Sequence, residues 1–380
     1  MVLPQVTDVA LIIGTRPEAI KVAPVVAALR QAGLRTRLVA TGQHRDLLHQ
    51  ALDAFGLKAD VDLGVMQPDQ DLAGLTTRAL AAVAAALKAD RPRFALVQGD
   101  ATSALAGALA SFYLEIPCGH VEAGLRSGNM KAPWPEEMNR RLVDQLCARH
   151  YPPTVGARDN LLKEGFDASS LVVTGQTGVD AVMTMAARAG NETPPELAGL
   201  LNGNPCRLVY ATGHRRESFH GEIGQVGAAL RALVDERPDV RVIFPAHPNP
   251  SVGRQLSDLA GSHERLHIIR AVSYPVSIWL MSHADVIVSD SGGIQEEAPS
   301  FGVPVLVTRD LTERPEGVEA GFLKIVGTRT AAVLQSLRTT LDDAELRERL
   351  RSTPNPYGDG RASQRIAEDV KRLLAVGSGS

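Results

Sequence analysis

Short apolar segments alternate with longer helical segments along the chain, and this alternation restricts the fold more than any other feature of the sequence. The expected strands are residues 9–13, 38–41, 94–98, 118–121, 171–174, 208–212, 240–244, 266–269, 286–289 and 303–307. The helical segments between them include residues 19–31, 75–88, 103–113 and 221–235. A repeat of strand, helix and strand makes a parallel sheet with helices on both faces, and such strands are apolar throughout. The sequence therefore predicts an α/β fold.

A polar stretch rich in Gly and Pro, residues 190–205 (GNETPPELAGLLNGNP), separates two blocks of this pattern. A chain of 380 residues suggests two domains at ~150 residues each. In a doubly wound sheet the ligand crevice opens at the carboxyl ends of the strands. We therefore expect two Rossmann-like doubly wound domains that face a central cleft.

The charge balance and the cysteine content exclude several classes of protein. The chain has 43 acidic and 40 basic side chains, whereas proteins that bind mainly nucleic acid or anionic lipid carry a broad basic field. Cys118, Cys147 and Cys206 have no Cys-x-x-Cys spacing, so neither a disulfide framework nor a structural zinc site is indicated. The longest apolar stretches fall short of the ~18–20 residues that span a bilayer. We expect a cytoplasmic protein without nucleic-acid or membrane partners.

The first expected strand is followed by GTRPEAIK, in which Gly14 permits a tight turn and Pro17 suits the first turn of a helix. Arg16 and Lys21 place two cations near this helix start, where the helix dipole opposes positive charge. An anion bound between the two cations and the backbone N–H groups explains their position. The alternative is a surface turn with solvated charges.

Three acidic residues are expected near strand ends of the first sheet. Asp100 follows residues 94–98, Glu122 follows residues 118–121, and Glu136 begins a helix after a proline. Carboxylates crowded into a partly dry cleft raise one another's pKa, so that one acts as an acid while its neighbour stays a base. General acid–base chemistry is one interpretation, and ordinary helix capping by Asp100 and Glu136 is the other.

Two histidines follow expected strands in the second block. His214 lies beside Arg215 and Arg216, and His247 lies in the sequence AHPNP. A histidine among arginines has its charged form disfavoured, so it acts as a neutral hydrogen-bonding group or as an acid of low pKa. A structural role is the alternative, and it is as well supported as a functional one for His247.

The strongest signal for anion binding is SDSGGIQEE, in which an apolar strand leads through a Ser-Gly-Gly turn into a helix. The Ser291 hydroxyl and free N–H groups then point outward, and Gly292 and Gly293 let a diphosphate approach closely. Glu297 is placed to accept hydrogen bonds from ribose hydroxyls. Arg314 adds a cation at the next strand end that suits the recognition of paired oxygens.

Motifs for other chemistries are absent. The sequence has no Walker Gly-Lys-Ser/Thr motif, no complete dinucleotide fingerprint and no Gly-x-Ser-x-Gly elbow. His44 and His49 are five residues apart, which is off the i, i+4 face that zinc-binding helices use. We therefore expect neither a metal ion nor a cofactor.

Nine motifs, in order over roughly residues 9–366, together resemble the non-hydrolysing UDP-N-acetylglucosamine 2-epimerases. They are GTRPEAIKVAPV, TGQHRDLL, QGDATSALAG, GHVEAGLRSGN, PWPEEMNRR, TGHRRESF, SDSGGIQEEAPSFGVPVL, TERPEGVEAG and NPYGDGRAS. The resemblance implies the GT-B architecture, with an N-terminal domain of residues 1–175 and a C-terminal UDP-binding domain of residues 176–360. It also implies a helix within residues 361–380 that packs back on the first domain, and a homodimer.

The resemblance assigns roles residue by residue. The family's catalytic group falls on Asp100, Glu122, Glu136 and His214. Its UDP-contacting positions fall on Arg16, Lys21, Ser291, Gly292, Gly293, Glu297 and Arg314. The positions that bind a second, activating UDP-GlcNAc in some bacterial members fall on Gln43, His44, Gln70, Arg215 and His247.

Two positions depart from the family pattern. Asp69 stands where members with the activating site commonly have arginine, and an anion beside a diphosphate speaks against such activation. Residues 274–279 lack the phenylalanine often found near the uracil. Either Trp279 takes its place, or base preference and substrate scope differ.

The implied activity is the reversible C2 epimerisation of UDP-GlcNAc to UDP-ManNAc without NAD, through elimination of UDP to 2-acetamidoglucal and its re-addition. The C2–H of the sugar is not adjacent to a carbonyl, so departure of UDP must come first or nearly so. Three alternatives remain: a hydrolysing 2-epimerase, a GT-B glycosyltransferase, and a regulator that binds a nucleotide sugar without turnover. The three carboxylates and His214 argue against the regulator, and a glycosyltransferase does not need so many acids.

Overall fold

The computed structural model describes residues 7–42, 45–67, 70–190, 192–201, 206–213, 222–246 and 263–376. The chain divides into two compact units. Unit 1 comprises Met1–Thr184 and Tyr357–Ser380, and unit 2 comprises Met185–Pro356. The sequence prediction set the two boundaries at residues 175/176 and 360/361, a few residues from these positions.

The position of the boundaries follows from contacts between α7 (Thr177–Ala189) and the start of α16 (Ala362–Val376). The Asp180 carboxylate accepts hydrogen bonds from the backbone N–H groups of Ala362 and Ser363 at 3.2 and 2.7 Å. These contacts satisfy N–H groups that the first turn of a helix leaves without partners. The first half of α7 therefore belongs to unit 1 together with α16.

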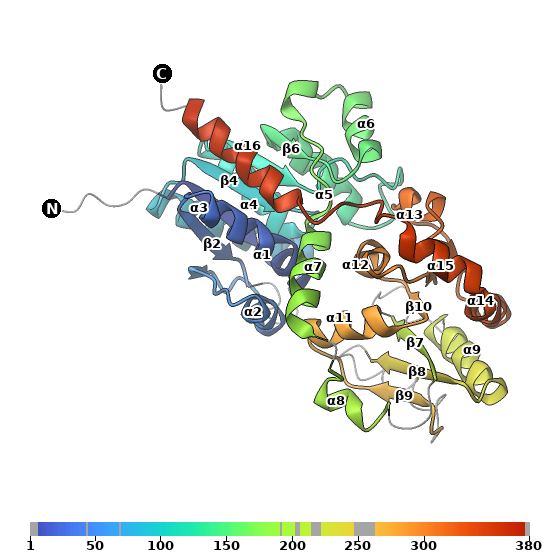
Figure 1. The fold of residues 1–380 in the computed structure, drawn as a ribbon. Coiled ribbons are helices and arrows are strands. Elements are labelled where there is room, and N and C mark those ends of the chain that lie inside the picture. The colour runs from blue at the N-terminus through green and yellow to red at the C-terminus, as the bar shows by residue number, and fades with distance from the viewer. Residues whose placement is uncertain are drawn as a thin grey trace. The chain divides into compact units, whose positions relative to one another are not determined.

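Unit 1 contains a six-stranded parallel sheet with the strand order β3-β2-β1-β4-β5-β6 (Figure 1). Its strands are β1 (Val9–Ile13), β2 (Thr36–Ala40), β3 (Val61–Asp62), β4 (Phe94–Gln98), β5 (Cys118–Val121) and β6 (Arg149–Tyr151). Its other helices are α1 (Arg16–Gln31), α2 (Arg45–Ala54), α3 (Leu72–Ala89), α4 (Thr102–Tyr113), α5 (Glu136–Leu146) and α6 (Val155–Lys163). Every residue of β1, β4 and β5 is buried, as expected for strands covered on both faces.

The C-terminal helix α16 packs against α1, as Figure 1 shows for the red and dark blue helices. Its Asp369 accepts two hydrogen bonds from Arg149 of β6, at 2.7 and 2.6 Å, and one from the Tyr151 hydroxyl at 3.1 Å. A paired guanidinium and carboxylate fix the orientation of two elements as well as their distance. The end of the chain is therefore attached to the edge of the unit 1 sheet.

Unit 2 repeats the same architecture. Its sheet has the parallel order β12-β11-β10-β7-β8-β9, which read from the β9 edge is the order of unit 1. Its strands are β7 (Arg207–Thr212), β8 (Val240–Pro245), β9 (Leu266–Ile269), β10 (Val286–Ser289), β11 (Val305–Val307) and β12 (Leu323–Ile325). Its helices are α8 (Pro195–Ala198), α9 (Glu222–Glu236), α11 (Tyr274–His283), α12 (Gly292–Glu297), α13 (Pro315–Glu319), α14 (Thr330–Asp342) and α15 (Ala344–Ser352). The prediction of two Rossmann-like doubly wound α/β domains is confirmed.

The prediction of a strand at residues 171–174 is wrong. Only Leu171 forms an isolated bridge, to His150 of β6, and Val173 is 36% exposed. Of its four residues only Thr174 is buried, so the segment lacks the continuous burial of the inner strands. The short strands β3, β6 and β12 were not predicted, because two or three residues carry too little periodicity to be recognised.

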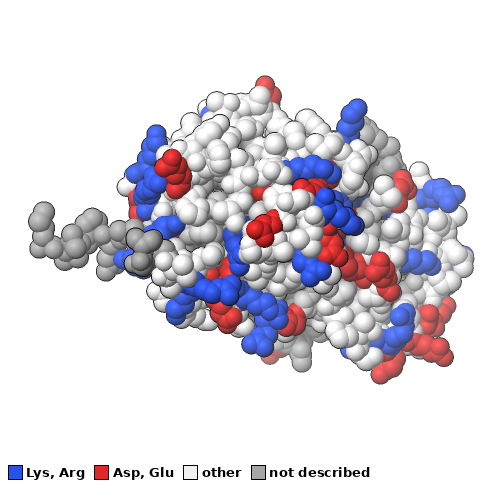
Figure 2. Space-filling model, turned by 90° about the horizontal axis from the view of Figure 1, so that it is seen from above, with Lys and Arg blue, Asp and Glu red and all other residues white. Residues whose placement is uncertain are grey.

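One described helix, α3, is long and apolar enough to cross a membrane by length and composition, with a mean hydropathy of 1.3. Its Leu75, Ala79, Val83 and Leu87 are buried in the core of unit 1, so it is a helix of this folded unit. On the face shown in Figure 2, basic and acidic side chains of the described residues lie interspersed.

Candidate active site

The predicted acids of unit 1 follow two neighbouring strands at the carboxyl edge of the sheet. The register pairs Gln98 of β4 with Val121 of β5, so Asp100 and Glu122 lie just beyond this pair. Glu122 has a φ of 73°, a left-handed conformation that is strained for a residue with a side chain. Such strain persists only where surrounding contacts hold the residue, and here it sets the direction of the Glu122 side chain.

The contacts that hold Glu122 are a buried ion pair and a buried amide. Lys21 Nζ of α1 and Gln98 Nε2 each lie 2.6 Å from Glu122 Oε2. Both groups only donate hydrogen bonds, so Oε2 accepts twice and carries no proton. Glu122 is 8% exposed and Lys21 is 7% exposed, and a buried charge requires such a partner. The family resemblance assigns Lys21 to UDP and Glu122 to catalysis. In the structure these two side chains contact each other.

Asp100 is held in the same way by α5. Arg140 Nε and Nη2 lie 2.8 and 2.7 Å from Asp100 Oδ2, and Arg140 Nη1 lies 3.1 Å from Oε2 of the fully buried Glu137. Asn139 Nδ2 donates to the Asp100 backbone oxygen at 2.8 Å. Glu136 begins α5 one turn before Arg140. The structure therefore brings Asp100, Glu122 and Glu136 to one edge of the unit 1 sheet.

The turn between β1 and α1 is occupied by a carboxyl group of the protein itself. The N–H groups of Gly14 and Thr15 lie 3.1 and 2.7 Å from Glu18 Oε2, and the Ser103 hydroxyl lies 2.6 Å from Glu18 Oε1. Burial raises the pKa of Glu18 to about 7, although these hydrogen bonds lower it. The N–H groups expected to bind an anion are thus already used. Arg16, the first residue of α1, is half-buried.

Sequence reasoning passed over Gln98 and Arg140, which hold Glu122 and Asp100, and over Glu18, which occupies the turn after β1. Two of them carried a signal. Gln98 is a polar residue at the end of an otherwise apolar strand, and Arg140 lies four residues after Glu136, on the same face of α5. Neither signal indicates which carboxylate the side chain contacts, since those carboxylates lie on other elements.

In unit 2 the predicted Ser-Gly-Gly turn lies against Arg314. A Cβ added to Gly292 would lie 2.6 Å from Arg314 Nη2, so only glycine allows this approach. Arg314 is 7% exposed, and its Nε lies 2.7 Å from Glu296 Oε1. A Cβ added to Gly293 would lie 3.7 Å from Glu297 Oε1. The structure therefore brings the turn, Glu297 and Arg314 together.

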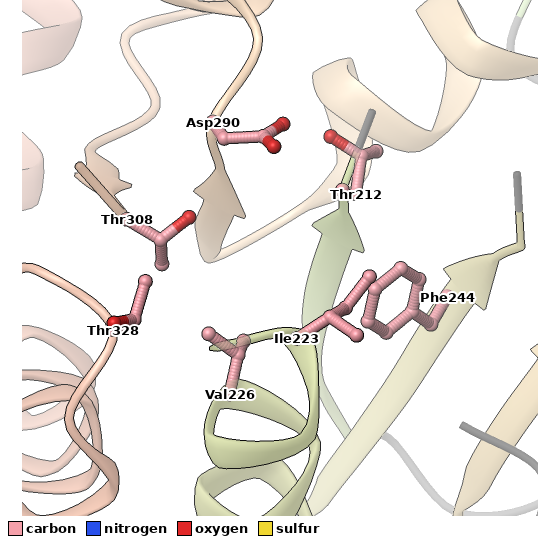
Figure 3. A pocket seen from close by; sticks show the side chains of 8 residues that line it. Thr212, Ile223, Val226, Phe244, Asp290, Thr308 and Thr328 are labelled. Atoms are coloured by element: carbon pink, nitrogen blue, oxygen red, sulfur yellow. The ribbon is translucent and has the colours of Figure 1, made fainter. Parts of the chain in front are cut away.

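A pocket opens beside this turn at the carboxyl ends of β7, β8, β10 and β11 (Figure 3). Its lining residues are Thr212, Gly213, Ile223, Val226, Phe244, Asp290, Thr308 and Thr328. The Asp290 carboxylate and the Thr212 hydroxyl face each other in Figure 3. Its open space, including the part that joins solvent, is about 260 Å³. The pocket lies where the strand order reverses between β7 and β10, which is where open α/β sheets bind ligands.

Several predicted residues lie outside the described part of the chain. These are Gln43, His44, His214, Arg215 and His247, together with Asp69. Gln70, the remaining residue of the predicted activating site, precedes α3, and its side-chain oxygen accepts hydrogen bonds from Arg78 and from the backbone N–H of Gln67. Among the described residues, no group of three or more His, Cys, Asp and Glu side chains is arranged to hold a metal ion.

The segment expected near a base forms the first turns of α11. Trp279 is 6% exposed, and its ring stacks on His283 with 3.9 Å between the ring centroids and 12° between the planes. The Tyr210 hydroxyl lies 2.9 Å from Ser277 Oγ. Trp279 is therefore packed within unit 2.

Comparisons with known proteins agree with this geometry. The family model of UDP-N-acetylglucosamine 2-epimerase matches residues 27–371. A probable UDP-N-acetylglucosamine 2-epimerase of Ralstonia solanacearum is 44% identical over 97% of this chain and 99% of its own. The UDP-GlcNAc 2-epimerase of Neisseria meningitidis bound to UDP-GlcNAc is 39% identical, with a TM-score of 0.91 over 96% of this chain and 100% of that one. The S. aureus MnaA–UDP co-structure is 40% identical, with a TM-score of 0.91 over 97% of each chain.

Proposed function

The chain belongs to the UDP-N-acetylglucosamine 2-epimerase family, and we propose that it interconverts UDP-GlcNAc and UDP-ManNAc without releasing the sugar. The observation that carries this proposal is the carboxylate edge of unit 1. There Lys21 and Gln98 hold Glu122, and Arg140 holds Asp100. A protein that only binds a nucleotide sugar does not need carboxylates fixed in this way by buried cations.

The first chemical step breaks the bond between C1 of the sugar and the UDP oxygen. The electron pair of this bond leaves with UDP, positive charge develops at C1, and the C2 proton becomes removable. A carboxylate of unit 1 takes the proton, and the C2–H electron pair forms the double bond of 2-acetamidoglucal. The electrons stay paired throughout, so the step needs no oxidant. We assign this proton to Glu122, because its ion pair with Lys21 favours the ionised form that a base requires.

The second step reverses the first from the other side of the sugar. An acid on the opposite face donates a proton to C2, and UDP adds back to C1. Asp100 and Glu136 are the candidates for this acid, since both lie at the same edge as Glu122. Epimerisation through this intermediate requires one base and one acid on opposite faces of the sugar.

We assign binding of the nucleotide to the Ser-Gly-Gly turn, Glu297 and Arg314 of unit 2 and to two cations of unit 1. The proposed contacts are Arg16, Lys21, Ser291, Gly292, Gly293, Glu297 and Arg314, with His214 beside the leaving diphosphate. Cations and oriented N–H groups stabilise the charge that develops on UDP as it leaves. Support comes from the S. aureus protein, whose structure was solved with UDP, and from the N. meningitidis protein, whose structure was solved with UDP-GlcNAc.

The deciding experiment is NMR of UDP-GlcNAc incubated with the protein in D2O. We expect deuterium at C2 of both UDP-GlcNAc and UDP-ManNAc, with no loss of total UDP-sugar. Accumulation of free ManNAc and UDP would indicate a hydrolysing epimerase instead. Transfer of the sugar to an acceptor without deuterium at C2 would indicate a glycosyltransferase. Unchanged substrate after long incubation would indicate a binding protein.

We further propose a homodimer formed through α3 and α4. Only 28% of the apolar α3 is buried, and α4, which packs on it, ends in Phe112 and Tyr113, which are 58% and 66% exposed. Apolar surface of this kind usually marks an interface. Sedimentation velocity should show a dimer at micromolar concentration, and a monomer there would contradict the proposal.

The cytoplasm is the proposed location, because Cys118, Cys147 and Cys206 are free thiols. A periplasmic or extracellular location in fractionated cells would contradict it.

We also propose that a second UDP-GlcNAc does not activate the enzyme, because Asp69 replaces a cation expected beside its diphosphate. Initial rates should then rise hyperbolically with UDP-GlcNAc concentration, and a sigmoidal rise would contradict this.

A further inference from the structure

His120 is a fully buried residue of β5, two residues before Glu122, and the proposed mechanism gives it no task. Its Nδ1 lies 2.6 Å from Asp144 Oδ1, and its Nε2 lies 2.8 Å from the backbone oxygen of Gly99. A carbonyl oxygen only accepts hydrogen bonds, and so does an ionised carboxylate. Both ring nitrogens thus lie against oxygen atoms, and Nε2 donates to the Gly99 carbonyl oxygen.

The partner on the other side, Asp144 of α5, is equally buried. Burial alone raises the pKa of Asp144, but the charges and hydrogen bonds of His120 and Arg126 outweigh burial and hold it below its usual value. Arg126 Nη2 donates to Asp144 Oδ2 at 2.7 Å. On the neighbouring strand, His150 Nε2 donates to the Asp144 backbone oxygen at 2.8 Å. Asp144 thus connects two histidines of adjacent strands, of which only His120 reaches Gly99.

The contact with Gly99 bears on Asp100, the next residue. Gly99 has a φ of 71°, and its N–H donates to the Val121 backbone oxygen at 3.0 Å. The hydrogen bond from His120 fixes the carbonyl of Gly99. This carbonyl belongs to the peptide group that joins Gly99 to Asp100. Rotation of that peptide plane would turn the Asp100 side chain away, because the Cα–Cβ bond moves with the backbone.

We propose that His120 is a positioning residue for proton transfer at C2: its Nε2–H holds the Gly99 carbonyl and thereby aims the Asp100 carboxylate. The inference rests on the proposed function, in which Asp100 takes part in that transfer. His120 itself touches neither the substrate nor a reacting atom. Arg140 holds the carboxylate of Asp100. His120 fixes the backbone to which the Asp100 side chain is attached.

Two substitutions separate the two nitrogens of His120. In His120→Gln the amide nitrogen falls near the position of Nε2, so the donor to Gly99 is retained while the Asp144 contact is lost. In His120→Asn the amide lies near Nδ1, so the Asp144 contact is retained while the donor to Gly99 is lost. A misplaced catalytic group costs about 10²-fold in rate for ~1 Å of displacement. We expect His120→Asn to lower kcat about 100-fold and His120→Gln to lower it about 10-fold or less.

The matched control is His150→Asn, which alters the other buried histidine beside Asp144 without touching Gly99. Its kcat should stay within about threefold of wild type. In all three variants the KM for UDP-GlcNAc and the calorimetric Kd for UDP should also stay within about threefold, because the nucleotide contacts are unchanged. Equal losses of kcat in both His120 variants, an equal loss in His150→Asn, or wild-type kcat in His120→Asn would overturn the proposal.

A further variant covers the case in which His120→Asn does not fold. Asp144→Asn leaves His120 in place: the neutral imidazole accepts at Nδ1 from the new amide and still donates from Nε2 to Gly99. Its kcat should stay within about threefold of wild type, and a folded variant with a 100-fold loss would contradict the assignment to Gly99. The D2O experiment on the wild type tests the proposed function separately, so a failure there is distinguishable from a failure of His120.

Discussion

The two units share one strand order, and in both a glycine and an aspartate follow the strands between which that order reverses, but different side chains surround them. In unit 1, β1 and β4 lead into Gly14 and Asp100, and in unit 2, β7 and β10 lead into Gly213 and Asp290. Around the unit 1 edge, two buried cations are paired with carboxylates, of which Glu122 is buried and Asp100 is partly exposed. The unit 2 edge also holds a buried ion pair, Arg314 with Glu296, but beside it opens a pocket lined by hydroxyls, apolar side chains and the single carboxylate of Asp290.

The difference separates two tasks that one fold performs. Buried ion pairs contribute little net stability, but their hydrogen bonds fix the orientation of a carboxylate, which proton transfer requires. A mainly apolar pocket with a few polar groups suits the binding of a ligand. The comparison therefore predicts that substitutions at the unit 1 edge lower kcat and that substitutions at the unit 2 edge raise KM.

The largest effect is expected for Glu122→Gln, which removes the proposed base while retaining its shape. General acid–base groups contribute about 10²–10⁴-fold to rate, so kcat should fall about 10³-fold or more. The Kd of UDP, measured by calorimetry, should change less than about threefold, because the UDP contacts assigned to unit 2 are intact.

The matched control is Glu115→Gln. Glu115 is the other described residue besides glycine with a positive φ, at 53°, and it is exposed. This variant should keep wild-type kcat. Full activity in Glu122→Gln would remove Glu122 from the mechanism and, with it, the contrast between the two edges.

The second prediction concerns Glu18, the buried carboxyl of the unit 1 edge. Burial raises its pKa from 4.5 to about 7 in the folded protein. The folded state therefore holds this proton more tightly than the unfolded state, and wild-type stability is lost as pH rises from about 4.5 through about 7. At 1.36 kcal/mol per pKa unit, the loss between pH 4.5 and pH 8 is about 3 kcal/mol.

Glu18→Gln cannot ionise, so its free energy of unfolding relative to wild type should improve by about 3 kcal/mol from pH 4.5 to pH 8. Urea unfolding at the two pH values measures this change. If the free energies of unfolding of the two proteins differ by the same amount at both pH values, Glu18 is already ionised near pH 7. Glu18 would then no longer distinguish the unit 1 edge from the unit 2 edge.

The sequence was sufficient to predict the sheet strands that are buried on both faces. β1, β4, β5 and β10 lie where they were predicted and are buried throughout, because short, mainly apolar runs between helical segments have no other stable place in an α/β domain. Of the edge strands, β9 was predicted at its observed residues, whereas β3, β6 and β12 were missed and the strand at residues 171–174 was wrongly predicted. Their residues are partly exposed, so burial leaves no clear pattern in the sequence.

The site was predictable only as a set of residues at strand ends. That Asp100 and Glu122 lie at one sheet edge follows from strand order, but their cations do not. Lys21 lies 101 residues before Glu122, and Arg140 lies 40 residues after Asp100. Such pairs depend on how α1 and α5 pack against the sheet, which no local pattern encodes.

The smallest effect is expected at the unit 2 edge, in Gly292→Ala. The added Cβ would lie 2.6 Å from Arg314 Nη2, so the guanidinium must move from the turn where we place the diphosphate. Loss of one hydrogen bond to a charged group costs about 1.5 kcal/mol, or roughly tenfold in affinity. KM and the Kd of UDP should therefore rise about tenfold while kcat stays within about threefold. Gly199→Ala, where an added Cβ meets nothing within 4 Å, should change neither. A fall in kcat at unchanged KM in Gly292→Ala would place part of the chemistry in unit 2, because Arg314 would then act on the transition state more than on the bound nucleotide.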